Sequence, residues 1–306
     1  MSKVAVVFPG QGSQSVGMIS DVIAQHAIAK DTLSEANEVL GFDLQTLIES
    51  GPADELNSTE NTQPALVAVE VALWRALNEK LAADIMAGHS LGEYSALVCA
   101  GALSFCDALK LVRRRGQLMQ EAVPAGEGGM AAVLGMQDDQ VEAICAQLSS
   151  YKIVQPANYN GPGQLVIAGH ADAVEKAAAQ CKEAGAKRAM ILPVSGPFHS
   201  ALMQPAADAF AGFIAEVDIK TPSVPVLQNA SIELETDPKR IRSNLVAQIA
   251  SPVNWTRTVE LLAEQGVESI FEVGPGKVLT GLNKRIDKSL SSSVINNSES
   301  IANILA

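Results

Sequence analysis

The residue with the clearest chemical potential is Ser90, the centre of the stretch GHSLG at 88–92. A short apolar run at 85–87 precedes this stretch and a helix-compatible run follows it, so the pattern predicts a strand, a sharp turn and a helix with the serine at the apex. Glycines two residues before and after the serine suit such a turn, because Cβ atoms there would collide with the neighbouring strand and helix. The pattern favours a nucleophilic serine. A serine that only caps the helix is the alternative.

A nucleophilic serine needs a base, and the chain has four histidines. His26 lies in a helical pattern that looks exposed, and His170 stands at the start of a helix in a separate segment. His89 adjoins Ser90 and is expected to point away from it. His199, at a strand-to-helix junction, is therefore the best candidate by elimination, although a lone histidine is often structural.

The helix predicted from about 105 to 122 carries Arg115 on an apolar stripe. Its helical neighbours three, four and seven residues away are Ala108, Leu111, Val112, Leu118, Met119 and Ala122. A guanidinium buried on such a stripe needs an anion, because an unpaired buried charge costs several kcal/mol. A substrate anion is one interpretation. A structural salt bridge, or an arginine that extends to the surface, is the other.

An oxyanion next to Ser90 needs two N–H donors, and Leu91 supplies one at the helix N-terminus. The first apolar run, KVAVVF at 3–8, reads as a buried strand that ends in a glycine loop, from which Gln11 is a candidate for the second donor. This loop is not predicted to hold a phosphate, because its glycines do not fall in G-x-G-x-x-G and no Gly-Lys-Ser/Thr follows.

Composition restricts the class of protein. The chain has 306 residues, 47% of them apolar, and a formal charge of -12, which makes nucleic acid a poor partner. No signal peptide and no membrane-spanning run is seen, so a cytoplasmic protein is expected. The four cysteines lack CxxC spacing and are predicted to be reduced thiols; no metal site is predicted.

The middle of the chain changes pattern between about 126 and 195. Its predicted elements are strand, helix, strand, strand, helix and strand, with a turn at Asn160-Gly161, and this βαββαβ order is that of a ferredoxin-like insert. The glycines at 126–129 and the stretch 195–197 are its predicted hinges. We therefore expect a core of 1–125 and 196–306, an insert of 126–195, and a cleft between them. Helices are also predicted at about 20–40 and 64–80, and the tail beyond 291 is predicted to be loosely ordered.

Taken together, motifs along the whole chain resemble those of the malonyl-CoA:acyl-carrier-protein transacylase family of bacterial fatty acid synthesis. They are FPGQGSQ at 8–14, TQPAL at 62–66, GHSLGEYSALVCAG at 88–101, RRRGQLMQEAVP at 113–124, GPFHSALM at 196–203, NA at 229–230, PVNW at 252–255 and EVGPGKVLTGL at 272–282. The resemblance implies an α/β fold, namely an α/β-hydrolase-like core with a parallel sheet and the ferredoxin-like insert.

The same resemblance implies roles for individual residues. Ser90 becomes the nucleophile and His199 its base, and Arg115 becomes the partner of the malonyl carboxylate. The amides of Gln11 and Leu91 become the oxyanion hole. Gln248 is implied to orient the histidine through its main-chain carbonyl. No cofactor is implied, since malonyl-CoA is a substrate and phosphopantetheine belongs to the partner, acyl carrier protein; a monomer is expected.

Acyl carrier proteins are acidic, so the net charge of this chain opposes the encounter and local basic patches must attract the partner. The candidate residues form three groups, namely Lys110, Arg113 and Arg114; Lys187 and Arg188; and Lys277, Lys284, Arg285 and Lys288. Three rival functions remain open at this point. They are a serine esterase or thioesterase, a related acyltransferase of polyketide synthesis, and a non-catalytic scaffold.

Overall fold

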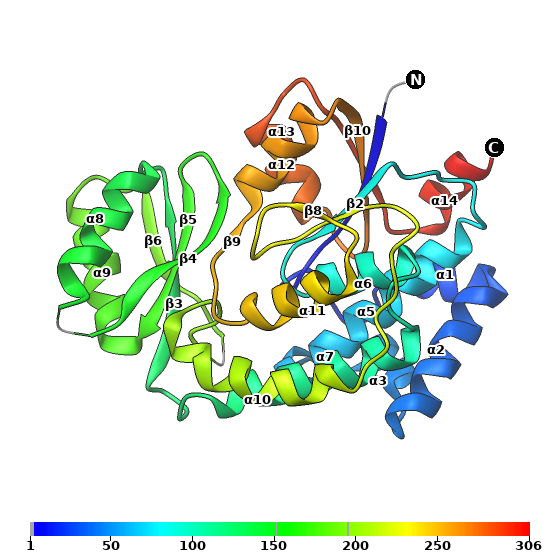
Figure 1. The fold of residues 1–306 in the computed structure, drawn as a ribbon, viewed down its shortest axis with the longest axis horizontal. Helices are drawn as coiled ribbons and strands as arrows, with labels where there is room; N and C mark the ends of the chain where they lie inside the picture. The colour runs from blue at the N-terminus through cyan, green and yellow to red at the C-terminus, as the bar shows by residue number, and fades with distance from the viewer. Residues whose placement is uncertain (1–2, 151, 195) are drawn as a thin grey trace.

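The computed structural model describes residues 3–150, 152–194 and 196–306, and it shows a large core with a smaller lobe beside it (Figure 1). The core contains a six-stranded sheet in the order β11-β10-β1-β2-β7-β8, in which all neighbours are parallel except β7 and β8. Its strands are β1 (Lys3–Phe8), β2 (Ile85–Gly88), β7 (Val226–Leu227), β8 (Leu234–Glu235), β10 (Val267–Val273) and β11 (Ser291–Ile295). The predicted parallel α/β core is confirmed.

Strand β1 lies in the middle of this sheet because both of its faces are apolar. Val6 and Phe8 belong to the larger apolar cluster, whereas Ala5 and Val7 belong to a smaller one on the other face, and all four are fully buried. The alternation follows the two-residue period of a strand. Its carboxyl end therefore leads into the 9–14 loop beside the carboxyl end of β2.

Helices cover both faces of the core sheet (Figure 1). They are α1 (Ser20–Gln25), α2 (Ala27–Leu40), α3 (Leu44–Ser50), α4 (Ala53–Asn57), α5 (Thr59–Ala76), α6 (Gly92–Cys99), α7 (Phe105–Glu121), η1 (Ala201–Met203), α10 (Gln204–Ala215), α11 (Pro238–Ala247), α12 (Trp255–Glu264), α13 (Val278–Ile286) and α14 (Ser298–Leu305). Helix α5 begins five residues before the predicted start at 64. The hydrophobic periodicity of the sequence did not indicate the first turn of α5, because the buried residues there, among them Thr59, Thr62 and Gln63, are polar.

Helix α7 packs closely on α5, and Gly116 makes this approach possible. A Cβ at Gly116 would lie 2.8 Å from the carbonyl oxygen of Thr59 and 2.9 Å from Cα of Glu60. Ser104 caps the helix by accepting a hydrogen bond from the Asp107 amide at 3.0 Å. The cap and the glycine together fix the rotation and the position of α7, and with them the direction of Arg115.

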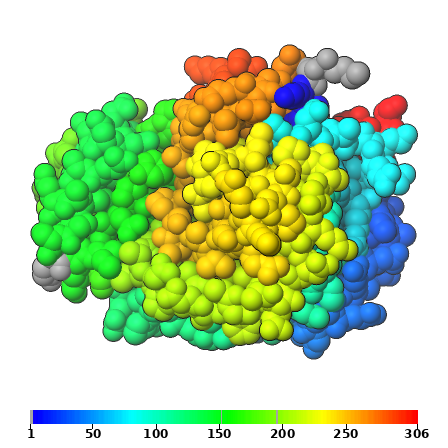
Figure 2. Space-filling view, in the orientation of Figure 1, coloured from blue at the N-terminus to red at the C-terminus, as the bar shows by residue number. Residues whose placement is uncertain are grey.

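The lobe is a second sheet in the order β6-β3-β5-β4-β9 with α8 (Asp138–Leu148) and α9 (Ala171–Glu183). Its strands are β3 (Gly128–Leu134), β4 (Val154–Gly161), β5 (Gln164–His170), β6 (Arg188–Ile191) and, from the core segment, β9 (Val253–Asn254). The predicted βαββαβ order is present, and the lobe is the green mass at the left of Figures 1 and 2. The turn predicted at 160–161 is wrong, because both residues belong to β4. The domain limits stay a prediction, and Ser195 of the expected hinge lies outside the described residues.

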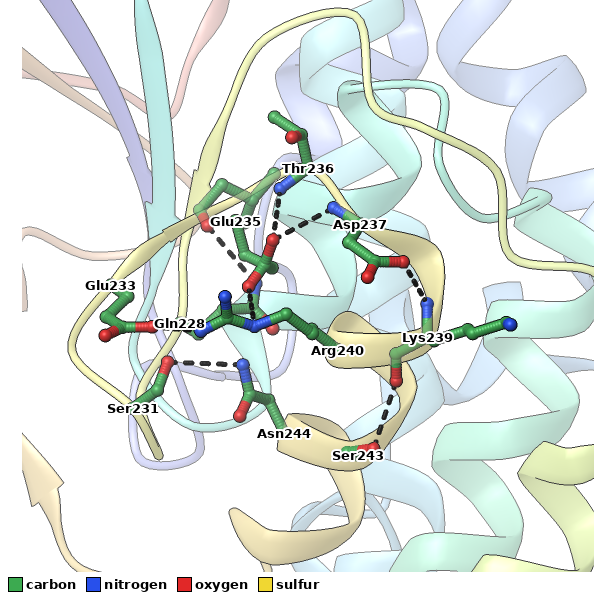
Figure 3. Close-up of polar contacts among 11 residues, drawn as sticks. Gln228, Ser231, Glu233, Glu235, Thr236, Asp237, Lys239, Arg240, Ser243 and Asn244 are labelled. Atoms are coloured by element: carbon green, nitrogen blue, oxygen red, sulfur yellow. Dashed lines mark hydrogen bonds and ion pairs between the residues drawn. The ribbon is translucent and has the colours of Figure 1, made fainter.

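Helix α11 is anchored at its N-terminus, where Asp237 accepts from the Lys239 amide at 2.9 Å and Glu235 accepts from the amides of Thr236 and Asp237, each at 2.9 Å (Figure 3).

The prediction of a loosely ordered tail beyond 291 is wrong, because β11 pairs with β10 in parallel and α14 follows. The tail is ordered because the edge of β10 offers it a row of backbone partners.

Candidate active site

The structure forms the predicted elbow at Ser90. Strand β2 ends at Gly88, Ser90 adopts a left-handed φ of 53°, and α6 starts at Gly92. A Cβ at Gly88 would clash with the backbone of Gly92 and Glu93, and one at Gly92 would clash with the backbone of Phe8. Left-handed backbone is costly for a serine, and strain of this kind is typical of functional positions. The turn presents the hydroxyl at the edge of a pocket.

The hydroxyl of Ser90 meets the ring of His199. Ser90 Oγ lies 2.7 Å from His199 Nε2, and His199 Nδ1 lies 3.0 Å from the main-chain oxygen of Gln248 and 3.2 Å from that of Ser251. A carbonyl can only accept, so Nδ1 carries the proton and Nε2 accepts from the serine. This is the tautomer that a general base requires. The Ser251 carbonyl is a second partner that the sequence did not indicate.

Burial is the main cause that lowers the pKa of His199 to about 3, and the positive charge of Arg115 also lowers it. The two carbonyl acceptors oppose this shift by favouring the imidazolium. The imidazole is therefore neutral, and able to accept a proton, at every pH near neutrality.

The depressed pKa of His199 predicts the pH dependence of acylation. The active form is the neutral ring, which is populated above the pKa, so a lower pKa extends activity toward acid. We expect kcat/KM for acylation of Ser90 to stay level from pH 8 to pH 5 as far as His199 is concerned, whereas an ordinary histidine would lose about 30-fold. Rapid-mixing rates across this range test the expectation. Because burial raises the pKa of Glu93 to about 7, the profile is also measured in Glu93→Gln; a midpoint near 6.5 in both proteins contradicts the prediction.

Arg115 reaches the same point from α7. Its side chain is 1% exposed; Nη1 donates to Gln63 Oε1 at 3.0 Å, and Nη2 donates to Gln248 Oε1 at 2.8 Å and to Ser90 Oγ at 3.1 Å. Within the described ranges no carboxylate forms an ion pair with it, so the alternative of a structural salt bridge is not seen. Neutral amide oxygens hold the guanidinium, and its charge remains available beside the serine.

These side chains line a pocket of about 250 Å³ between the core and the lobe. Its wall is largely apolar and is formed by Met119, Met130, Val166, Leu192, Val194, Phe198, Val278, Leu279 and Leu282. Gln11 and Leu91 also line it, and in the described part of the chain neither of their amides donates a hydrogen bond. Both residues thus line the same pocket as Ser90 and have amides that are not used within the described structure, so they stay the candidates for the two donors to an oxyanion.

The sequence profile of the acyl transferase domain matches residues 5–301. The chain belongs to this family. It is 54% identical to the malonyl CoA-acyl carrier protein transacylase of Salmonella typhimurium over 97% of this chain and 96% of the relative, and 46% identical to that of Staphylococcus aureus over 98% of both.

Solved structures agree. An acyl carrier protein S-malonyltransferase from Vibrio cholerae superposes with a TM-score of 0.96 at 53% identity, covering 99% of this chain and all of the other. A malonyl-transacylase in complex with a type II PKS acyl-carrier protein superposes with a TM-score of 0.97 at 49% identity, covering 99% of both chains. The chain is thus an acyltransferase with the fold of these enzymes.

Three side chains at this acyltransferase site were not singled out in the sequence. Gln63 holds Arg115, Asn229 holds the backbone of the elbow, and Glu93 lies fully buried behind them. Gln63 and Asn229 stand in the quoted motifs TQPAL and NA. No sequence signal marked their contacts, because the partners lie 52 and 139 residues away along the chain.

The other histidines do not reach the hydroxyl of Ser90. His89 pairs with Asn160 at 2.9 Å, as expected of a ring that turns away, and His170 contacts the Ile153 carbonyl at 3.4 Å. Within the described ranges, no group of histidine, cysteine or acidic side chains could hold a metal ion, and no helix is long and apolar enough to cross a membrane.

Proposed function

We propose that this enzyme transfers the malonyl group of malonyl-CoA to the phosphopantetheine thiol of acyl carrier protein through malonyl-Ser90. The observation that carries the proposal is the buried guanidinium of Arg115, which lies 3.1 Å from Ser90 Oγ and forms no ion pair with a carboxylate of the described residues. A nucleophile for uncharged acyl groups has no use for such a charge. A fork of N–H donors fits the carboxylate of a malonyl group and would hold its thioester carbonyl near the serine.

In the first half-reaction His199 Nε2 takes the Ser90 proton as Oγ attacks the thioester carbonyl carbon. The oxyanion that forms accepts hydrogen bonds from the Gln11 and Leu91 amides. Collapse of the tetrahedral intermediate breaks the C–S bond, and the CoA sulfur leaves with the proton of the imidazolium. A main-chain carbonyl behind His199, in place of a carboxylate, adds no second negative charge next to the malonyl group.

In the second half-reaction the same groups work in reverse. His199 takes the proton of the phosphopantetheine thiol, the sulfur attacks the acyl carbon of malonyl-Ser90, and the proton returns to Ser90 Oγ. The reaction needs no resident cofactor, because both thiols belong to substrates. We propose that it serves fatty acid synthesis in the cytoplasm, which the names of the relatives and the four free thiols support. We also propose that the enzyme acts as a monomer.

Carrier protein must dock where its prosthetic thiol can enter the pocket. Val278, Leu279 and Leu282 of α13 line that pocket, and the same helix region carries the exposed group Lys277, Lys284, Arg285 and Lys288. In the first candidate group, Arg113 donates to the Leu40 carbonyl and Arg114 to Gln117. Arg285 of the α13 group also has a partner, because it donates to Gln164 at 2.9 Å. We propose the α13 group as the docking patch because its helix lines the pocket, and the other two groups as weaker candidates.

Charge reversal at the α13 patch provides a kinetic prediction. In the double variant Lys284→Glu with Lys288→Glu, the rate constant for reaction with acyl carrier protein is expected to fall about tenfold at low salt, because steering toward an acidic partner is lost. Acylation by malonyl-CoA is expected to change little. The same reversal at Lys220 and Lys239, which are exposed and belong to none of the three candidate groups, is the matched control for net charge. Equal losses in both half-reactions contradict the assignment.

Intact-protein mass spectrometry after addition of malonyl-CoA tests the proposed function. A malonyl adduct on wild type that is absent in Ser90→Ala is the expected result. A protein without an adduct would favour the scaffold. An adduct that water removes as fast as carrier protein does would favour a thioesterase.

A further inference from the structure

Glu93 is a buried carboxylate that the proposed mechanism does not use. It lies in the first turn of α6, three residues after Ser90, and is 0% exposed. Its Oε2 accepts from the main-chain N–H of Asn229 at 3.0 Å and from Nε2 of Gln248 at 2.8 Å. It does not line the pocket. Burying a carboxylate is costly, so its retention behind the site needs an explanation.

The first of its two partners holds the nucleophile. Asn229 Oδ1 accepts from the main-chain N–H of Ser90 at 2.7 Å, and its Nδ2 donates to the carbonyl of Gly88 at 2.7 Å. This side chain thus clamps both sides of the elbow, whose serine is in a strained left-handed conformation. By accepting from the Asn229 backbone, Glu93 fixes the base of the clamp.

The second partner aims the guanidinium. The Gln248 amide donates to Glu93 and to the Ser90 carbonyl, at 2.8 and 2.9 Å, and its Oε1 accepts from Arg115 at 2.8 Å. Only one orientation of the Gln248 amide satisfies all three contacts, because Arg115 can only donate, whereas the Ser90 carbonyl and the Oε2 of Glu93 act as acceptors. Without the carboxylate one reason for that orientation is lost, and a flipped amide would place its NH₂ against the guanidinium.

We propose that Glu93 is a positioning residue that fixes the elbow through Asn229 and the Arg115 guanidinium through Gln248, and so maintains the preference for a carboxylated acyl group. This inference rests on the function proposed above. It deepens that function by assigning part of the acyl selectivity to a side chain that contacts neither the pocket nor the Ser90 hydroxyl. A merely structural Glu93 would affect folding and leave the selectivity of the folded enzyme unchanged.

The test compares acylation of the full chain by malonyl-CoA and by acetyl-CoA, with thermal unfolding followed in parallel. Glu93→Ala removes both acceptor contacts, Glu93→Met does so with less loss of volume, and Glu93→Gln retains one oxygen that can accept from both donors. Glu235→Ala is the matched control. It also removes a buried carboxylate that accepts two N–H groups, together with an ion pair to Arg240, but at the far end of α11 (Figure 3).

We expect Glu93→Ala to lower kcat/KM for malonyl-CoA by about 10- to 100-fold, the range for buried donors left unpaired, and to lower the acetyl-CoA value less. The malonyl-to-acetyl ratio falls about tenfold, Glu93→Gln recovers most of it, and the control retains it. If Glu93→Ala does not fold, we expect Glu93→Met to show the same tenfold fall in the malonyl-to-acetyl ratio.

A folded Ala or Met variant that keeps the wild-type ratio overturns the inference. So does a Gln variant as defective as Ala, or a control whose ratio falls equally. Failure of the proposed function gives a different result from failure of this inference. In that case the wild-type enzyme itself would form no malonyl adduct or would show no preference for malonyl-CoA over acetyl-CoA.

Discussion

Replacement of Ser90 by alanine is expected to lower malonyl transfer by about 10⁴- to 10⁶-fold and to remove the covalent malonyl adduct. The reason is that no other nucleophile stands 2.7 Å from the Nε2 of His199 in the described structure. The fold should persist, because alanine and serine pay a similar cost for a left-handed φ. Initial rates with malonyl-CoA and acyl carrier protein, together with intact mass, provide the measurement.

Ser95→Ala is the control for this variant. Ser95 is buried on α6, the helix that follows the elbow, and does not line the pocket, so its loss should leave the rate within a few-fold of wild type. If Ser90→Ala retained more than about a hundredth of the wild-type rate at unchanged thermal stability, the serine would not be the acyl carrier.

Replacement of Arg115 by alanine is expected to lower kcat/KM for malonyl-CoA by about 10²- to 10³-fold, the size of a lost buried charge-assisted contact, while acetyl-CoA loses far less. The preference for malonyl should therefore nearly vanish. Arg115→Lys should recover only part of it, because an ammonium cannot reproduce the planar fork that now donates to Gln63, Ser90 and Gln248. Parallel acylation rates with the two thioesters provide the ratio.

Arg114→Ala is the matched control on the same helix. That guanidinium is half-buried over the ring of Phe213, outside the pocket, so its loss should not change the ratio. A full malonyl preference in Arg115→Ala would mean that another group recognises the carboxylate.

The parts of this site that the sequence could predict are those with a local signal. Ser90 has a glycine two residues before it and another two residues after it. Arg115 is the one charged residue on an apolar stripe at helical spacing. His199 could be found by elimination because histidines are few. The first two signals are local in the sequence, and the third depends only on the number of histidines. The structure brings the three side chains together. Their catalytic roles stay proposals until the variants are measured.

The parts that could not be predicted depend on distant segments. Glu93 meets Asn229 and Gln248 across 136 and 155 residues, and nothing in its own helix marks that contact. Strand β9 joins the sheet of the lobe from the core segment, next to β4, which no periodicity of the insert indicates. The C-terminal segment 291–295 is short and begins with three serines, so its sequence does not indicate a strand. It nevertheless pairs with β10 as an edge strand.

The central claim is transfer of a malonyl group through Ser90 to a carrier thiol, and the fate of the isolated malonyl-enzyme tests it most directly. The measurement mixes this intermediate with holo acyl carrier protein or with buffer alone and follows both decays by intact mass. We expect rapid discharge to the carrier protein, with the malonyl mass appearing on that partner, and slow hydrolysis in buffer. Equal decay in the two mixtures, with no malonyl mass on the carrier protein, would contradict it.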